Sequence, residues 1–427
     1  MLRRWDVGRT AALVVVGASL AASCGQAEFT TPPSPEFFEG RRAEPTVVAP
    51  DDIDGTPDGA GSDPDADVLL SAIEPDADGV ALERMTLVDD AGVAAPNVSG
   101  WAHFDEVLAD RLIPADVSAS VAVMIDGQLV HAAAFGERVA GAGEPVDTSD
   151  RFRVASISKS ITAITTLRLV EAGALTLDEP VGDLLVGHLG LTTVDPDVAS
   201  ITVRELLSHT AGFPQHEGTF FSNGAASCTE AASIGLSRSV SSGSGFRYSN
   251  MSYCVLGLLI EAVTGKTYER VVTEQLLTPL GLSGMRLTAT YELGPDEVSH
   301  HPSPNRNFME ALGAAGAWNA TPSDLVTIFN SVDPSTPGWK ALSPDLLSVL
   351  RYRVPADTPP GGYGLGVINY DGDAWGHTGT LQNTHAMVLV QPGGLTWAIT
   401  VSGEYPSNTG QLRSIMQHAL AAGFPTS

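Results

Sequence analysis

Residues 156–172 read SISKSITAITTLRLVEA and are the strongest structural signal in the chain. Apolar side chains recur there at helical spacing, at Ile157, Ile161, Ile164 and Leu167, and Gly173 follows as a helix stop. Only three of these 17 residues are charged. A helix that is apolar on nearly every side is stable only when protein surrounds it, so we expect this segment in the middle of a folded domain.

Strand and helix patterns lie on both sides of this segment. Upstream, the apolar runs 121–125 and 129–135 flank Asp126-Gly127, a pair typical of a hairpin turn. Further strands are expected at 363–370, 384–391 and 396–403. Helices are expected at 103–112, 203–208, 251–264, 267–277 and 410–422. Strands and a helix at both ends, with helices between, predict a discontinuous α/β body that carries a mostly helical insertion.

The first 24 residues have the pattern of an export signal. Three arginines in the first nine residues precede an apolar run, 11–22, that is too short to span a bilayer comfortably. The run ends in Leu20-Ala21-Ala22-Ser23-Cys24, which resembles a bacterial lipobox and would make Cys24 the lipidated first residue of the mature protein. An ordinary cleaved signal is the alternative. We therefore expect an exported protein of the cell envelope, in contact with the membrane only through its lipid anchor, or else a secreted one.

Residues 25–100 differ in composition from the rest. They hold 17 of the chain's 50 acidic residues against three arginines, and no helical or strand period persists there. Self-repulsion and low apolar content predict an acidic disordered linker, followed by one folded domain over 101–424. Because the chain has a net charge of −27 and no basic cluster, it would repel phosphates, and nucleic-acid binding is not expected.

Ser156 and Lys159 carry the first chemical pattern. A serine hydroxyl is a weak nucleophile until a neighbour withdraws its proton. Spacing i, i+3 places the two side chains on one helix face, and the N–H groups at the helix start favour a developing oxyanion. Lysine is rarely buried without a task, and a buried lysine gives up its proton more easily than one in water. Taken alone, however, a Ser-x-x-Lys match is a weak signal.

Two further boxes follow. In Tyr248-Ser249-Asn250, a tyrosine beside a lysine can act as general acid or base, and the asparagine amide can bond both the lysine and a substrate. The same residues could simply cap the helix that starts at Met251. In His377-Thr378-Gly379-Thr380, the glycine lets an extended backbone lie close to a ligand, and the Thr380 N–H becomes available as an oxyanion donor beside that of Ser156.

Together the three boxes resemble the signatures of the serine β-lactamase and D-alanyl-D-alanine carboxypeptidase superfamily: Ser-x-x-Lys, a second polar box and Lys-Thr-Gly. The Tyr-x-Asn form at 248–250 is similar to that of class C β-lactamases and related esterases. The resemblance covers about 101–424 and extends to the segments 202–212 and 316–318. It implies an α/β (α+β) fold, β-lactamase/transpeptidase-like, with an antiparallel sheet flanked by helices and a mostly helical inserted subdomain.

The resemblance also implies the chemistry. Ser156 attacks and forms an acyl-enzyme, Lys159 and Tyr248 move protons, and Asn250, His377, Gly379 and Thr380 bind the substrate. No metal or cofactor is required. His209, in the 202–212 segment, has no acidic partner nearby in sequence and is interpreted as part of the scaffold.

The substrate is less determined. His377 stands where true β-lactamases have lysine, and no Lys or Arg occurs from Tyr363 to Trp375 to meet a substrate carboxylate. We therefore expect hydrolysis of short-chain esters or amides. The alternatives are a D-alanyl-D-alanine carboxypeptidase acting on peptidoglycan stem peptides, a class C-like β-lactamase and a non-catalytic envelope binding module. The expected partner is a small-molecule or peptidoglycan-derived acyl substrate, and the expected state is a monomer.

Cys228 and Cys254 are the two cysteines of the predicted domain. After export both would face an oxidising compartment, where they can pair. A disulfide between them would pin the glycine- and serine-rich loop at 241–245 to the helix that follows Tyr248.

Overall fold

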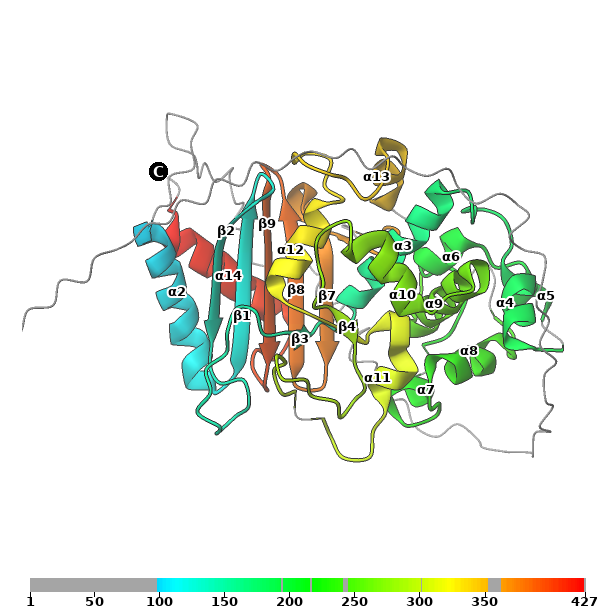
Figure 1. Ribbon diagram of the computed structural model, residues 1–427, viewed down its shortest axis with the longest axis horizontal. Coiled ribbons are helices and arrows are strands. Elements are labelled where there is room, and N and C mark those ends of the chain that lie inside the picture. Colours follow the sequence, from blue (N-terminus) through cyan, green and yellow to red (C-terminus); the bar gives the residue numbers. More distant parts are fainter. Residues whose placement is uncertain are drawn as a thin grey trace, which may run out of the picture. The chain divides into compact units, whose positions relative to one another are not determined.

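The computed structural model describes residues 98–192, 195–215, 217–240, 245–300, 302–351 and 362–425 (Figure 1). The predicted export signal at 1–24, Cys24 and nearly all of the acidic linker at 25–100 lie outside these residues. Within the described ranges, no helix combines the length and hydrophobicity needed to span a membrane. The first helix of the described residues, α2 (Val98–Leu112), begins three residues before the predicted start of the domain at Trp101.

A six-stranded antiparallel sheet with the strand order β2-β1-β9-β8-β7-β6 forms the body of the domain. The strands are β1 (Ser118–Ile125), β2 (Gln128–Phe135), β6 (Ile368–Asn369), β7 (Trp375–Leu381), β8 (Thr384–Gln391) and β9 (Leu395–Ser402). β1 and β2 form the predicted hairpin, and Asp126 and Gly127 both have positive φ, as a tight two-residue turn requires. β1 also pairs with β9, so the N-terminal hairpin and the C-terminal strands share one sheet. The predicted discontinuous α/β fold is confirmed.

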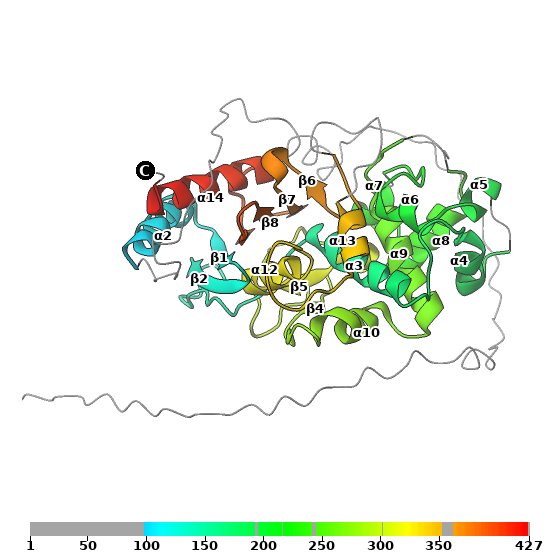
Figure 2. The same ribbon diagram turned by 90° about the horizontal axis from the view of Figure 1, so that it is seen from above.

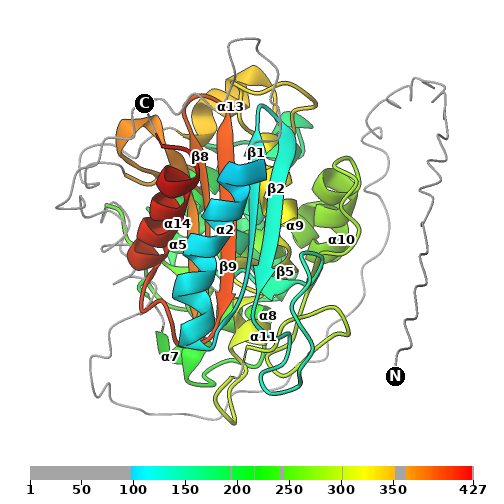
Figure 3. The same cartoon turned by 90° about the vertical axis from the view of Figure 1, so that its left-hand side faces the viewer.

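Both faces of the sheet are buried. Along β8, Ala386, Val388 and Val390 belong to one apolar cluster, while Met387 and Leu389 belong to another. This period of two is the alternation that a strand imposes on its side chains. The first cluster packs against α3 and α12, and the second against α2 and α14 (Thr409–Gly423), on the opposite face (Figures 2 and 3).

Between β2 and β6 the chain is mostly helical. The longer helices there are α3 (Ile157–Glu171), α4 (Gly182–Leu189), α8 (Cys228–Leu236), α9 (Asn250–Thr264), α12 (Pro322–Asn330) and α13 (Pro344–Leu350). The short ones are α5 (Pro196–Ala199), α6 (Val203–Leu207), α7 (Glu217–Phe221), α10 (Tyr268–Val272), η3 (Thr273–Leu277), α11 (Phe308–Leu312) and η4 (Gly313–Ala315). Two further short helices, η2 (Ile113–Ala115) and η5 (Asp371–Asp373), lie before β1 and after β6. α3 lies between the sheet and α9 and is buried over almost its whole length, as predicted (Figure 1).

Two predicted elements differ from the structure. The strand predicted over 363–370 is reduced to the two residues of β6, because the Gly364 N–H donates to the Val367 carbonyl and the chain turns back on itself. Gly366 makes this turn at a φ of +86°, and a Cβ there would lie 2.2 Å from the Cβ of Ala163 in α3. The single helix predicted over 267–277 is an α-helical turn, α10, followed by the π-helical segment η3.

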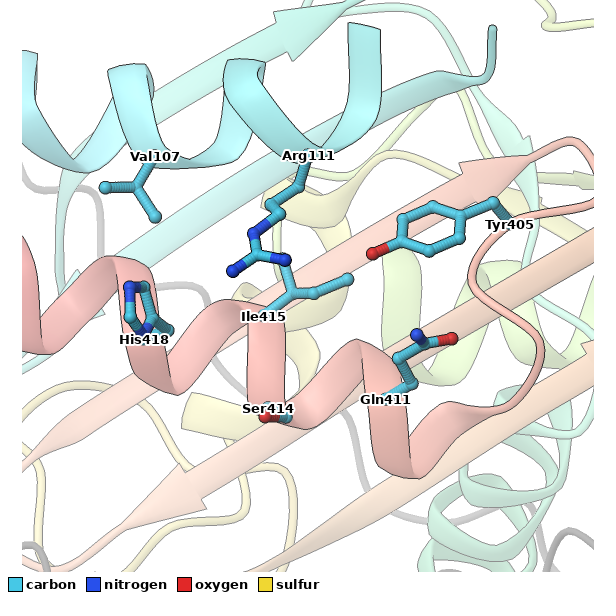
Figure 4. Close-up of a pocket in the computed structure, with 7 residues that line it drawn as sticks. All are labelled: Val107, Arg111, Tyr405, Gln411, Ser414, Ile415 and His418. Atoms are coloured by element: carbon cyan, nitrogen blue, oxygen red, sulfur yellow. The ribbon is translucent and has the colours of Figure 1, made fainter. Parts of the chain in front are cut away.

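A surface pocket lies between α2 and α14 (Figure 4). Its lining residues are Val107, Arg111, Tyr405, Gln411, Ser414, Ile415 and His418. None of the predicted site residues lines it, and the two helices cover the face of the sheet opposite α3. The predicted chemistry is therefore located elsewhere.

Cys228, the first residue of α8, and Cys254 in α9 have Sγ atoms 2.17 Å apart and Cα atoms 5.6 Å apart. We predict that the two are paired in the mature protein, which would join two helices that pack together. In the denatured, unreduced protein, at most one thiol, that of Cys24, should titrate. Reduction should lower the free energy of unfolding by roughly 3 kcal/mol, the chain-entropy value for such a loop.

A matched control is the double variant Cys228→Ala/Cys254→Ala. It should be destabilised to a similar degree, and its stability should not respond to reductant. Two or more free thiols in the unreduced wild type would contradict the pairing.

Candidate active site

Ser156 lies at the start of α3, at the end of a tight turn. β3 (Phe152–Arg153) pairs with β5 (Trp318–Ala320), which also pairs with β4 (Arg286–Leu287), and this small sheet leads the chain to the turn. Ala155, directly before Ser156, has a φ of +46°. Such a conformation is costly for alanine, and local strain of this kind collects at functional sites.

Lys159 lies one turn further along α3 and is completely buried. Its Nζ donates hydrogen bonds to Ser156 Oγ at 2.9 Å, Asn250 Oδ1 at 2.7 Å and the Ala315 carbonyl at 3.0 Å. These oxygens belong to a hydroxyl, an amide and a peptide, and none carries a charge. An ammonium group is more costly to bury among neutral acceptors than beside a carboxylate, which suits a group that must give up its proton.

Tyr248 and Asn250 approach Lys159 from the start of α9. The Tyr248 ring is buried, and its centroid lies 4.8 Å from Lys159 Nζ. Asn250 is the first residue of α9, and its Nδ2 has no hydrogen-bond partner among the described residues. The side chain of Ser249 does not cap α9, because its hydroxyl donates a hydrogen bond to the Pro214 carbonyl instead. The start of α9 therefore presents a phenol and an amide at the lysine.

β7 lies against the turn that carries Ser156. A Cβ at Gly379 would come within 2.2 Å of the Val154 carbonyl oxygen and 3.1 Å of the Ser156 backbone nitrogen. A side chain at position 379 would clash with this turn, so glycine is required there. The sequence predicted that the glycine lets the backbone approach a ligand, whereas its close neighbour in the structure is the protein's own turn. β6 pairs with β7 only at Trp375 and Gly376, so the later part of this β7 edge has no partner strand among the described residues. Thr380 lies on that part of β7.

His377 is fully buried in β7, and both of its ring nitrogens are used inside the protein. The Tyr363 hydroxyl donates to Nε2 at 3.0 Å, and Nδ1–H donates to the Thr378 carbonyl at 2.6 Å. Burial, with a smaller contribution from the charge of Lys159, lowers the pKa of His377 to about 3. The ring is neutral at pH 7 and supplies no positive charge for a substrate.

The structure thus brings Ser156, Lys159, Tyr248 and Asn250 into one cluster and places the Gly379 backbone beside it. The His377 side chain contacts Tyr363 instead. Two contributors could not be found from the local sequence: the Ala315 carbonyl at the lysine, and His209, whose ring centroid lies 4.3 Å from that of Tyr248. No group of His, Cys, Asp and Glu in the described part of the chain is arranged to hold a metal ion.

A serine and a lysine one turn apart on a buried helix, with a tyrosine over the lysine, are an arrangement that can supply the nucleophile and proton carriers of a serine hydrolase. The family model described as Beta-lactamase matches residues 105–420. The protein therefore belongs to the Beta-lactamase family, and it is a serine hydrolase of the β-lactamase and penicillin-binding protein superfamily.

Individual relatives agree with this family. Penicillin-binding protein 4 of Amycolatopsis lactamdurans is 29% identical, over 70% of this chain and 84% of that protein. Esterase EstB of Burkholderia gladioli is 27% identical, over 75% of this chain and 94% of the esterase. The crystal structure of SurE with D-Leu has a TM-score of 0.62 and 25% identity, covering 78% of this chain and 77% of that chain.

Three buried histidines lead to a pH prediction. Burial lowers the pKa of His209 well below its usual value, that of His377 to about 3 and that of His385 to about 4. Because the unfolded chain takes up these protons near pH 6.5 and the folded protein does not, the free energy of unfolding should fall as the pH falls from 6.5 toward 4. Each histidine contributes at most about 1.4 kcal/mol per pH unit.

Urea denaturation between pH 7 and pH 5 measures this slope above the range in which most carboxylates titrate. His385→Gln should remove about one histidine's share of the slope. His418→Gln, which replaces an exposed histidine on α14, is the matched control. Equal slopes in wild type and His385→Gln would show that His385 binds its proton in the folded state.

Proposed function

We propose that the protein is exported, forms an acyl-enzyme on Ser156 and hydrolyses short-chain esters or amides. The observation that carries the proposal is the 2.9 Å contact between Lys159 Nζ and Ser156 Oγ beside the Tyr248 ring. The named activity of the relative Esterase EstB supports the ester class. In this proposal the export signal covers 1–24 and the linker 25–100, and the hydrolase acts as a monomer on a small-molecule or peptidoglycan-derived acyl group.

The proposed reaction has two halves. Ser156 Oγ attacks the substrate carbonyl, and its proton passes to the Lys159–Tyr248 pair, which starts the reaction with the Tyr248 phenol ionised beside the Lys159 ammonium. The backbone N–H groups of Ser156 and Thr380 stabilise the oxyanion. The pair then returns that proton to the leaving alcohol or amine as the bond to the carbonyl carbon breaks. In the second half, water gives a proton to the same pair, attacks the acyl group and frees Ser156 with its hydroxyl restored. Asn250, through its amide nitrogen, binds the substrate's acyl side.

Electrostatics argues against a free carboxylate as a main recognition element. Desolvating a carboxylate costs several kcal/mol unless a fixed cation meets it. His377 is neutral, and both its nitrogens are occupied. Arg351 is engaged near the start of β7, where it donates to Asn369 Oδ1 and the Asp373 carbonyl. Arg353 lies outside the described residues.

Replacing the nucleophile tests the mechanism. Ser156→Ala should abolish hydrolysis of a nitrophenyl acyl ester, and Tyr248→Phe should lower kcat by about 10²–10⁴-fold through lost acid–base catalysis. Ser158→Ala is the matched control, because Ser158 Oγ instead accepts a hydrogen bond from the backbone N–H of Trp318, at 3.2 Å. Near-wild-type turnover in Ser156→Ala would overturn the proposal, and so would a wild type that labels with neither a fluorophosphonate nor a fluorescent penicillin.

A pair of substrates tests the specificity. A stem-peptide mimic ending in D-Ala-D-Ala should be a poorer substrate, by kcat/KM, than its methyl ester, because the ester carries no charge into the pocket. Preference for the free acid would instead favour the carboxypeptidase hypothesis. In that case Arg247, exposed directly before Tyr248, is the first cation to replace, as Arg247→Gln.

A further inference from the structure

His209 lies just beyond α6, in a backbone conformation that histidine rarely adopts. Its φ is +58°, and its side chain is almost completely buried. A non-glycine residue at positive φ costs free energy, so the surrounding contacts must hold it in place. Those contacts converge on the segment that carries Tyr248.

His209 accepts two hydrogen bonds, from the residues on either side of Tyr248. The backbone N–H of Arg247, one residue before it, donates to the His209 carbonyl at 2.8 Å. The backbone N–H of Ser249, one residue after it, donates to His209 Nδ1 at 3.2 Å. The main chain on both sides of Tyr248 is thus anchored to one residue from a different part of the sequence.

The imidazole ring also packs against the phenol. The ring centroids of His209 and Tyr248 are 4.3 Å apart, and the rings of Tyr253 and Tyr363 lie 5.0 Å and 4.7 Å from the same imidazole. The phenol is therefore confined laterally as well as through its backbone. Lys159 Nζ lies 4.8 Å from the centroid of that phenol, so the lateral position of the ring sets its distance from the lysine.

The protonation state of His209 agrees with these contacts. Burial is the main reason that its pKa lies well below the usual value, and the charge of Lys159 lowers it further. The ring is neutral, and because Nδ1 accepts the Ser249 N–H, the proton is on Nε2. Nε2 has no hydrogen-bond partner among the described residues. A buried donor left unpaired lowers stability, so packing stability alone does not explain a histidine at this position.

We propose that His209 is a positioning residue that holds the Tyr248 phenol in register with Lys159 and Ser156. This inference rests on the proposed function, because it assigns His209 a role in the proton transfer made by Tyr248. Misplacing a catalytic group by about 1 Å can cost about 10²-fold in rate. His209 itself transfers no proton and contacts no reacting atom.

The test is a double-mutant cycle on hydrolysis of a nitrophenyl acyl ester. His209→Gly removes the ring and relaxes the backbone, since glycine favours positive φ. His209→Asn keeps an acceptor at the Nδ1 position and tolerates the same backbone. Each is measured alone and together with Tyr248→Phe, with thermal unfolding recorded for every variant. If His209→Gly is not folded at the assay temperature, the cycle is measured at a lower temperature at which thermal unfolding shows every variant folded.

His209→Gly should lower kcat by about 10–100-fold with KM within about 3-fold of wild type, and His209→Asn should restore most of that loss. In the Tyr248→Phe background, His209→Gly should cost less than about 3-fold more, because the phenol that it positions has lost its hydroxyl. Ser208→Ala is the matched control. Its hydroxyl bonds the Arg204 carbonyl and Thr210 rather than the Tyr248 segment, so the variant should lose stability and keep its kcat.

Two results would overturn the inference: an equal loss from His209→Gly in both backgrounds, or lower stability with unchanged kcat. Neither result affects the proposed function, which is tested by Ser156→Ala in the same assay. If Ser156→Ala keeps its turnover, the proposed function fails whatever the His209 variants do.

Discussion

The ammonium group of Lys159 ties three distant parts of the chain together. Its hydrogen bonds reach Ser156 on the same helix, Asn250 at the start of α9 and the Ala315 carbonyl in η4. A buried cation that loses one acceptor pays a desolvation cost of more than 1 kcal/mol, so the three segments constrain one another. The position of α3 inside the domain follows from its apolar surface, and the hydrogen bonds of Lys159 fix how α9 and η4 meet it.

Much of the fold was predictable because it follows from local patterns. The apolar period around α3, the Asp126-Gly127 turn and strand β8 all depend on neighbours within about ten residues. The strand predicted over 363–370 was wrong because the glycines there allow a turn and a close approach to α3, which depend on tertiary packing. Local periodicity carries no information of that kind.

The candidate site was predictable as a set of residue types and only in part as a geometry. The spacing of Ser156 and Lys159 on one helix required their contact. The direction of the Ala315 carbonyl and the packing of His209 on Tyr248 depend on how separate segments meet. His377 illustrates the same limit. Its position in the third box predicts substrate binding, but its ring forms hydrogen bonds with Tyr363 and the Thr378 carbonyl inside the protein.

The pairing of β1 with β9 has a consequence for biogenesis. Ser118 pairs with Ser402, so about 280 residues must be made and brought back before the edge of β1 is covered. Contacts of such long sequence separation slow folding, and an uncovered strand edge invites pairing with other chains. A chain interrupted before Leu395 would leave the β1 edge of the β1–β2 hairpin open as well as the β2 edge, which is also the edge of the complete sheet. The edge of β1 therefore stays available to other chains until β9 has been made.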